Sequence, residues 1–258
     1  GLGDVYKRQG LIRIAFSQAL PFFGSACFYG MIVFCGKIWY NKAMKNRDGR
    51  KTVRSCMNMK EYVIEKTVGA PDWTKVSELQ VDNVCWLPDA GVRMEQQICY
   101  DDKKIYVHQV AHEKNIRAEL TDKLGSICTD SCMEFFFSPV PEDGRYFNIE
   151  LNLNGAIFLG FGHGRADSIR LIPEDHKKLF NIRTNKTADG WEIFYEIPLE
   201  FLHVFYPDYD FKSGRVIRAN CFKCGDLTVQ PHYMMWNETT SETPDFHRPQ
   251  DFGRMIFA

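Results

Sequence analysis

Apolar and polar residues alternate along several stretches of the chain after residue 60, with the period of two that is typical of half-buried β-strands. In the longest of these, 147–161, apolar residues occupy alternate positions on both sides of the dipeptide Asn154-Gly155. Because Asn-Gly takes the positive φ angles of a two-residue turn, this stretch predicts a β-hairpin. A second hairpin is predicted for segments 94–100 and 105–110, which flank the acidic dipeptide Asp101-Asp102.

Other short segments rich in aromatic and β-branched residues also favour strands. These segments are 62–67, 132–138, 191–197, 216–222 and 255–257. Only residues 198–205 are typical of a helix, because Pro198 stands at the first position and apolar residues follow at helical spacing. Many short strands and one short helix predict an all-β fold, a β-sandwich of two antiparallel sheets.

Composition supports a globular protein, since 45% of the 258 residues are hydrophobic and 25% are charged. The net charge of -1 hides an asymmetry, because residues 1–59 carry ten Lys and Arg against two Asp and Glu. Residues 60–258 carry twenty-two against thirty-one and are therefore acidic. Phosphate contacts need clustered Lys and Arg, so this part of the chain is not expected to bind nucleic acid.

The first 56 residues lack the alternation and have two alternative interpretations. Residues 1–9 contain Asp-Val-Tyr-Lys-Arg-Gln, which matches the translation of a transposase end sequence used to prepare sequencing libraries. Residues 10–56 are then a non-native upstream segment. Alternatively, the uncharged run 14–36 is long enough for a membrane anchor, and the basic cluster after it would place the C-terminal side in the cytoplasm. In both cases residues 57–258 form the folded module.

The chain has nine cysteines, an odd number without the pattern of a disulfide framework. Those of the folded module fall mostly within apolar runs, where a free thiol behaves as a small buried side chain. A reducing cytoplasm is therefore the predicted compartment, with membrane attachment only if the run 14–36 is genuine.

Motifs of catalysis and metal binding are weak. His108 and His112 have the spacing of a helical zinc pair, but on a strand they would lie about 13 Å apart, too far for one ion. Cys221-Phe-Lys-Cys224 is a single CxxC pair, for which packing within a strand is favoured. A glycosidase pair stays open, but spacing along the chain cannot place two carboxylates at the required separation of about 5–9 Å. The strand carboxylates are Glu134, Glu150, Glu192 and Glu196. No catalytic residue and no metal site is predicted.

Six motifs follow one another along residues 60–258. They are Asp-Ser-Cys-Met-Glu-Phe-Phe-Phe (130–137), Tyr-Phe-Asn-Ile-Glu-Leu-Asn-Leu-Asn-Gly (146–155), Trp191 with Ile-Pro-Leu (197–199), Arg-Ala-Asn-Cys-Phe-Lys-Cys-Gly-Asp (218–226), Trp236, and Asp-Phe-His-Arg-Pro-Gln-Asp-Phe-Gly (245–253). Together they resemble the carbohydrate-binding modules of family 9, in the stand-alone form found in bacterial proteins.

The resemblance implies a jelly-roll-like β-sandwich related to the DOMON domains. It implies binding of the terminal sugars of oligo- or polysaccharides without hydrolysis, in carbohydrate catabolism. No cofactor is expected, with calcium as a family-level alternative through loop oxygens such as those of Asp101 and Asp102.

Six residues are expected at the sugar site from this resemblance. Better-known members of the family hold a terminal sugar between two Trp faces, with charged and amide side chains at its hydroxyls. Trp236 matches the C-terminal Trp position, and its polar loop context predicts exposure. Trp86 is the expected second face, with Trp73 as its competitor. The expected polar residues are Arg117, Glu134, Asn220 and His247. Each has a structural alternative: a surface charge for Arg117, a buried pair for Glu134, a backbone partner for Asn220, and fixing of the final loop for His247.

Two other functions stay open. A DOMON-type haem-binding electron-transfer domain needs a His/Met or His/His axial pair. The side chains available for it are His163, His232, Met234 and Met235. An unrecognised glycoside hydrolase would use the strand carboxylates. The leading hypothesis is a monomer that binds a mono- or oligosaccharide and has no catalytic activity.

Overall fold

The structure, a computed structural model, describes residues 59–258. The segments 1–9 and 10–56, and with them the uncharged run 14–36, lie outside the described residues. From residue 59 onward, no helix has the length and apolar character needed to cross a membrane.

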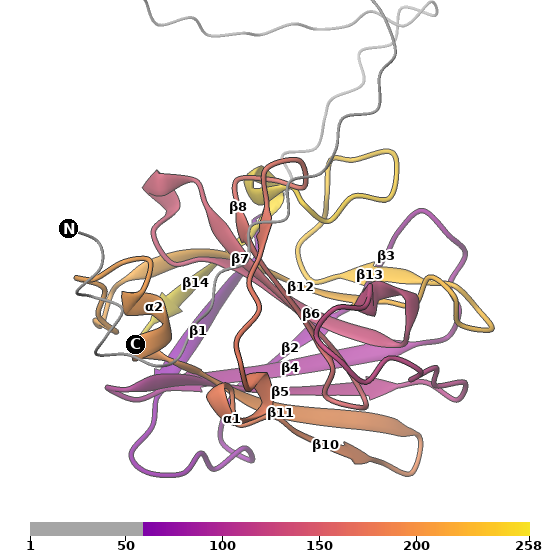
Figure 1. The fold of residues 1–258 in the computed structure, drawn as a ribbon, viewed down its shortest axis with the longest axis horizontal. Coiled ribbons are helices and arrows are strands. Elements are labelled where there is room, and N and C mark those ends of the chain that lie inside the picture. The colour runs from indigo at the N-terminus through magenta and orange to yellow at the C-terminus, as the bar shows by residue number, and fades with distance from the viewer. Residues whose placement is uncertain (1–58) are drawn as a thin grey trace, which may run out of the picture. The chain divides into compact units, whose positions relative to one another are not determined.

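Two β-sheets pack face to face (Figure 1). The first, called the β5 sheet, contains β2 (Glu78–Val81), β4 (Arg93–Tyr100), β5 (Lys104–His112), β10 (Arg183–Lys186) and β11 (Gly190–Pro198). The second, called the β6 sheet, contains β3 (Asn83–Val84), β6 (Cys132–Ser138), β7 (Tyr146–Asn152), β8 (Ile157–Gly162), β9 (Ile169–Arg170), β12 (Val216–Cys224), β13 (Tyr233–Met235) and β14 (Gly253–Phe257). The all-β sandwich expected from the alternation is confirmed.

Strand β1 (Glu61–Lys66) belongs to both sheets, which a purely antiparallel sandwich does not predict. Its first four residues pair with β14 and its last two with β4, and both pairings are parallel. The prediction of two wholly antiparallel sheets is therefore wrong at this strand. Strand β1 crosses from one sheet to the other and joins them. It keeps one direction throughout, and this direction is parallel to both β14 and β4.

Helices are short and lie between strands. The predicted helix is α2 (Leu199–His203), which begins directly after Pro198. A second helix, α1 (His176–Leu179), was not predicted; its one turn is capped by the Asp175 side chain, which accepts from the Lys178 amide at 3.0 Å. Three 3₁₀ turns complete the elements: Ile127–Thr129, Pro141–Asp143 and Pro249–Asp251.

The hairpin at Asn154-Gly155 is confirmed as β7 and β8, but its turn differs from the predicted two-residue type. Of the two residues only Gly155 has a positive φ, +68°. The strands end at Asn152 and resume at Ile157, so four residues connect them. The Asn154 side chain is used elsewhere, since its Nδ2 donates to the carbonyls of Ala118 and Leu120 at 2.9 Å. The turn therefore also anchors the loop that carries those carbonyls.

Burial differs sharply between the two central strands. On β5 every second residue is buried, which is the pattern of a strand with one face in the core. On β6 all seven residues are buried. Met133, Phe135 and Phe137 face the core between the sheets, whereas Phe136 belongs to a second apolar cluster on the other side. The β6 sheet is thus covered on both faces, and its outer face lies beneath loops.

Candidate functional site

One row of residues crosses the outer face of the β6 sheet. Phe222 on β12 is the register partner of Glu134 on β6, Glu134 is the partner of Glu150 on β7, and Glu150 is the partner of Phe158 on β8. Neighbouring strands lie about 4.8 Å apart, so the row places two adjacent carboxylates between two aromatic rings. Glu134, one of the predicted site residues, therefore lies beside a second carboxylate and close to aromatic rings.

The two carboxylates are removed from solvent. Glu134 is 2% exposed and Glu150 is 7% exposed. Burial raises the pKa of Glu134 to about 7, and burial together with the charge of Glu134 raises the pKa of Glu150 well above its usual value. Arg165 and Arg170 act in the opposite direction on Glu150. Two buried carboxylates side by side resist losing both protons near neutral pH, unless a cation shares the site.

The side-chain amide of Asn148 lies beside the two carboxylates, in space left by the absence of a side chain at Gly160. Asn148 Nδ2 donates to Glu150 Oε1 at 2.9 Å. A Cβ on Gly160 would stand 1.9 Å from Asn148 Oδ1, so a larger residue on the neighbouring strand would displace the amide. Asn148 Oδ1 itself is buried without a hydrogen-bond donor. The Asn148 side chain therefore orients Glu150 through its Nδ2, and its Oδ1 stays available as a hydrogen-bond acceptor on this face.

Trp86 stands above one end of the row. Its ring lies 5.4 Å from Phe246 and 5.6 Å from Tyr233, and its Nε1 donates to the Ser241 carbonyl at 3.0 Å. Its φ is +61°, and a bulky residue in this region costs on the order of 1–3 kcal/mol. The surrounding contacts thus hold a strained backbone that places a half-buried indole beside Phe246, which in turn stacks on Phe222 at 4.2 Å.

Arg170 and Phe158 stand at the other end. The Arg170 guanidinium lies 4.4 Å from the centroid of the half-buried Phe158 ring. It also donates to the carbonyls of Leu124 and Gly125, so its position is fixed by the loop that precedes β6. An aromatic ring with a positively charged group over it therefore borders the carboxylates on this side.

His247 lies on the same face as part of the last loop. Its Nδ1 is 2.7 Å from the Tyr146 hydroxyl, and its ring is 5.2 Å from Phe136. Burial, followed by the charge of Arg165, lowers the pKa of His247 to about 4. The imidazole is therefore neutral at pH 7 and ties the loop to the sheet, as the structural alternative for this residue predicted.

The predicted exposure of Trp236 is wrong. The side chain is 4% exposed and belongs to the core between the sheets. Its amide donates to the Cys221 carbonyl at 2.9 Å, so residue 236 continues the path of β13. A Cβ on Gly253 would meet the indole ring at 2.5 Å. The polar residues that follow Trp236 belong to the next loop, and they say nothing about the direction of the ring.

Arg117 and Asn220 contact the protein's own backbone. The Asn220 side chain donates to the Asn237 carbonyl and accepts from the Asn237 amide, both at 2.8 Å. Arg117 Nε donates to the Thr129 carbonyl and lies 3.3 Å from Asp130 Oδ1. Both side chains therefore fix loops, and a contact with sugar stays a prediction for them.

The structure brings three of the six predicted residues, Trp86, Glu134 and His247, to one aromatic cluster. It adds Glu150, Phe158 and Arg170, which were not predicted at the site. The signal for Glu150 was its place between Asn148 and Asn152 at alternate positions of β7. The same alternation fits a solvated face, because the loops that cover this face cannot be located from the sequence.

The competitor Trp73 lies in the turn before β2, and its ring packs against the outer face of the β5 sheet, 5.3 Å from His108. With Tyr106 and Phe194 it lines a cavity of about 290 Å³ on the outer face of the β5 sheet. A second cavity of about 210 Å³ on this face is lined by polar residues that include Gln97, His108 and His112. Trp86 and Trp73 therefore mark two separate faces of the molecule.

Side chains considered for haem or calcium have other partners. Met234 packs in the core, and His232 Nε2 lies 2.9 Å from Lys223 Nζ. His163 pairs with Asp167 at 2.8 Å. Asp101 accepts from the amides of Lys103 and Lys104, and so it closes the turn between β4 and β5.

Comparison with known proteins identifies the family. The model of carbohydrate-binding family 9 matches residues 66–257. The chain belongs to this family. Carbohydrate binding, the function expected from the six motifs, is thereby confirmed. No curated protein matches the chain.

Solved structures confirm the fold of this family 9 chain. A Bacteroides uniformis ATCC 8492 protein assigned as carbohydrate-binding shares 24% identity with a TM-score of 0.65, covering 78% of this chain and all of its own. A family 9 module from Caldicellulosiruptor kristjanssonii in complex with cellotriose shares 12% identity with a TM-score of 0.56, covering 77% of this chain and 93% of its own. A family 9 module from the same organism in complex with glucose shares 12% identity with a TM-score of 0.56, covering 77% of this chain and 96% of its own.

Proposed function

We propose that the chain binds the terminal sugar of an oligo- or polysaccharide, without hydrolysing it, on the outer face of the β6 sheet. The observation that carries this proposal is the row in which two carboxylates lie between aromatic rings, with Trp86 held above one end at a positive φ. The terminal sugar packs on Trp86 at the rim of this row, and further sugar units extend from there toward Phe158, about three strand spacings away.

The chemistry of the rim suits a pyranose. The apolar C–H face of the ring packs on an aromatic face, and the hydroxyls exchange hydrogen bonds with water for bonds to fixed polar groups. Glu150 supplies an acceptor and Arg170 a donor, and both are held by other contacts, so little side-chain entropy is lost on binding. Glu134 lies one strand further in and supports Glu150 rather than reaching the sugar.

A glucose-type ligand is the proposed class, because family 9 modules of the same fold are known with cellotriose and with glucose. Hydrolysis is not part of the proposal. A glycosidase needs an acid and a base that reach the scissile bond and a water molecule. Glu134 is 2% exposed and accepts from the Cys224 thiol, so the pair does not offer an acid and a base that both reach a scissile bond.

Calorimetric titration of the full chain with glucose, cellobiose and cellotriose tests the proposal. We expect saturable binding that Trp86→Ala weakens by about 2 kcal/mol, roughly 30-fold in Kd, because an aromatic anchor is lost. The matched control is Trp73→Ala, a half-buried Trp beside the other sheet, which we expect to leave Kd unchanged.

Loss of binding in Trp73→Ala with retention in Trp86→Ala would transfer the site to the β5 sheet and contradict the proposal. Release of reducing sugar from cellotriose by the wild-type chain would contradict the non-catalytic part.

A further inference from the structure

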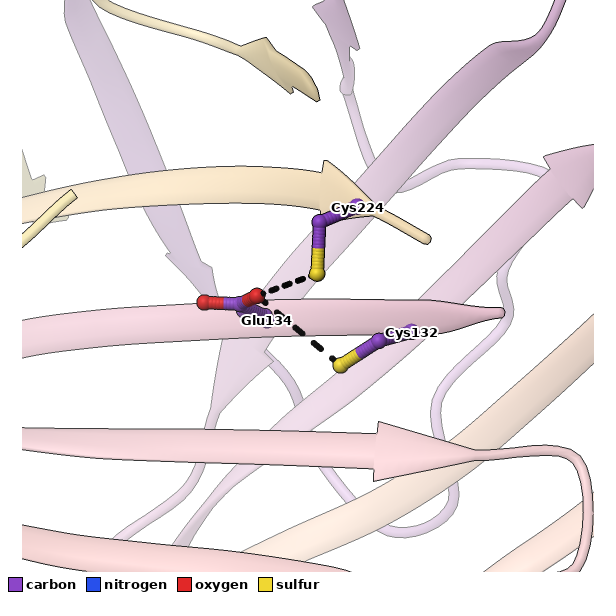
Figure 2. Close-up of side chains that lie close together, drawn as sticks. All are labelled: Cys132, Glu134 and Cys224. Atoms are coloured by element: carbon purple, nitrogen blue, oxygen red, sulfur yellow. Dashed lines mark hydrogen bonds between the residues drawn. The ribbon is translucent and has the colours of Figure 1, made fainter. Parts of the chain in front are cut away.

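Beside the row of carboxylates, two thiols converge on Glu134. Cys132 begins β6 and Cys224 ends β12, and the two are register partners on adjacent strands. Glu134 lies two residues after Cys132, so the period of a strand places all three side chains on the outer face. Figure 2 shows both sulfur atoms directed toward the same carboxylate.

The three donor atoms lie within 4.8 Å of one another. Glu134 Oε1 is 2.9 Å from Cys224 Sγ and 3.9 Å from Cys132 Sγ. Tetrahedral zinc with bonds of about 2.3 Å to sulfur and about 2.1 Å to oxygen separates neighbouring donors by roughly 3.5–3.8 Å. The two observed separations lie on either side of this range, so small side-chain rotations bring the three donors to the spacing of a coordination shell.

Burial and charge favour a bound cation at this place. All three side chains are at most 2% exposed, and Glu150, a second buried carboxylate, is the register partner of Glu134. Two adjacent carboxylates repel each other strongly in a region of low dielectric constant, and a cation bound at Glu134 offsets this repulsion. A divalent ion that displaces the thiol protons removes this penalty, because the ligands bind it as anions.

We propose that Cys132, Glu134 and Cys224 form a binding site for a thiophilic divalent cation of the zinc class. Two sulfur donors select against calcium and magnesium, which take oxygen ligands. The loop before β6 closes the remaining side, since the Cys128 carbonyl lies 3.8 Å from Cys224 Sγ. The ion links the start of β6 to the end of β12 beneath the loops. It thereby stabilises the part of the β6 sheet next to Glu150.

This inference does not depend on sugar binding, because the geometry of the three ligands stands without a saccharide. In the proposed site Cys224 binds the ion together with Cys132, whereas Cys221, the other cysteine of the CxxC motif, does not contact it. Cys221 faces the core between the sheets, on the opposite side of β12. The two proposed sulfur ligands, Cys132 and Cys224, lie on adjacent strands and are 92 positions apart in the sequence.

Metal titration of the full chain tests the site. The reduced protein, treated with a chelator, is titrated with Zn²⁺ against a chromophoric chelator and separately with Co²⁺. We expect one ion per chain at this site, thiol proton release on Zn²⁺ uptake, and a sulfur-to-cobalt charge-transfer band in the near ultraviolet.

The variants compare the two faces of β12. Cys132→Ser, Cys224→Ser and Glu134→Gln should each weaken binding by more than the roughly 10–100-fold that loss of an outer-shell partner costs. The two cysteine variants should also weaken the charge-transfer band, whereas Glu134→Gln should keep both sulfur ligands. Cys221→Ser, on the same strand, is the matched control and should leave affinity and spectrum unchanged.

Thermal unfolding supplies a second readout for variants that fold poorly. Zn²⁺ should raise the Tm of the wild type and of Cys221→Ser, because a ligand that binds only the folded state stabilises it. It should not raise the Tm of Cys224→Ser or Glu134→Gln. The proposal is overturned if the reduced wild type takes up no ion at this site, or if Cys221→Ser loses the ion as Cys224→Ser does.

Discussion

The outer faces of the two sheets follow the same alternation of residues, yet they have opposite environments. On the β5 sheet the outward side chains keep part of their surface in solvent, as His108 and Glu192 do in their pair at 3.0 Å, with exposures of 12% and 23%. On the β6 sheet the equivalent positions, such as Glu134 and Phe136, are buried beneath loops. The difference shows that the covering loops, rather than the strands themselves, decide whether an outward polar side chain is exposed to solvent or buried in a candidate site.

The largest expected difference between the faces is in stability. Phe136 is 1% exposed on the outer face of the β6 sheet, whereas Phe194 is half-exposed on the outer face of the β5 sheet. Phe136→Ala should lower the free energy of unfolding by about 3–5 kcal/mol, because it leaves a cavity. Phe194→Ala should cost roughly 1 kcal/mol, since only part of its surface leaves water on folding.

Urea denaturation of both variants measures these values. Equal losses for Phe136→Ala and Phe194→Ala would mean that the loops do not seal the β6 sheet in solution, and the contrast between the faces would be lost.

A smaller effect is expected where Asn148 meets β8. Gly160→Ala places a methyl group on the Asn148 side chain and should cost about 1–3 kcal/mol through overpacking. Gly164→Ala is the control, because its nearest neighbouring atom lies 3.9 Å from the new Cβ. The double variant Gly160→Ala/Asn148→Ala should recover part of the loss. If it recovers nothing, the close approach of β7 and β8 is not the cause.

The pH dependence of stability should have opposite signs on the two faces. Burial and Arg165 lower the pKa of His247 from 6.5 to about 4. Between these values the unfolded chain binds more protons, so this residue makes stability fall as pH falls, by at most about 1.4 kcal/mol per pH unit. On the β5 sheet burial lowers the pKa of His112, but Asp189 and Glu95 outweigh it and raise the pKa above 6.5. The stability from that ion pair is present below pH 6.5 and is lost as pH rises through the raised pKa.

Urea denaturation at several pH values checks the signs. His247→Gln should flatten the dependence between pH 4 and 6.5, and His112→Gln should flatten it on the side above 6.5. The same change from both variants would show that the two faces do not differ in their electrostatics.

Much of the fold could be predicted because alternation is a local signal. The strands β6, β7 and β12 were expected within two residues of their observed ends, and the hairpin around Gly155 was expected at its observed place. The parallel pairings of β1 could not be predicted, since they depend on which strands meet across the sandwich. The site was harder still. Trp236 and Trp86 are both followed by loops, and only the register of β13 and the covering loops show that the Trp236 ring enters the core.

The proposed position of the sugar is at Trp86, above the β6 sheet, and not at Trp73, beside the β5 sheet. Titration with cellotriose, observed at the indole Nε1–H signals of the five Trp residues of the ¹⁵N-labelled full chain, tests it most directly. Single Trp→Phe variants assign the signals. We expect the Trp86 signal to shift saturably while the Trp73 signal stays in place. A saturable shift of Trp73 with an unmoved Trp86 would contradict it.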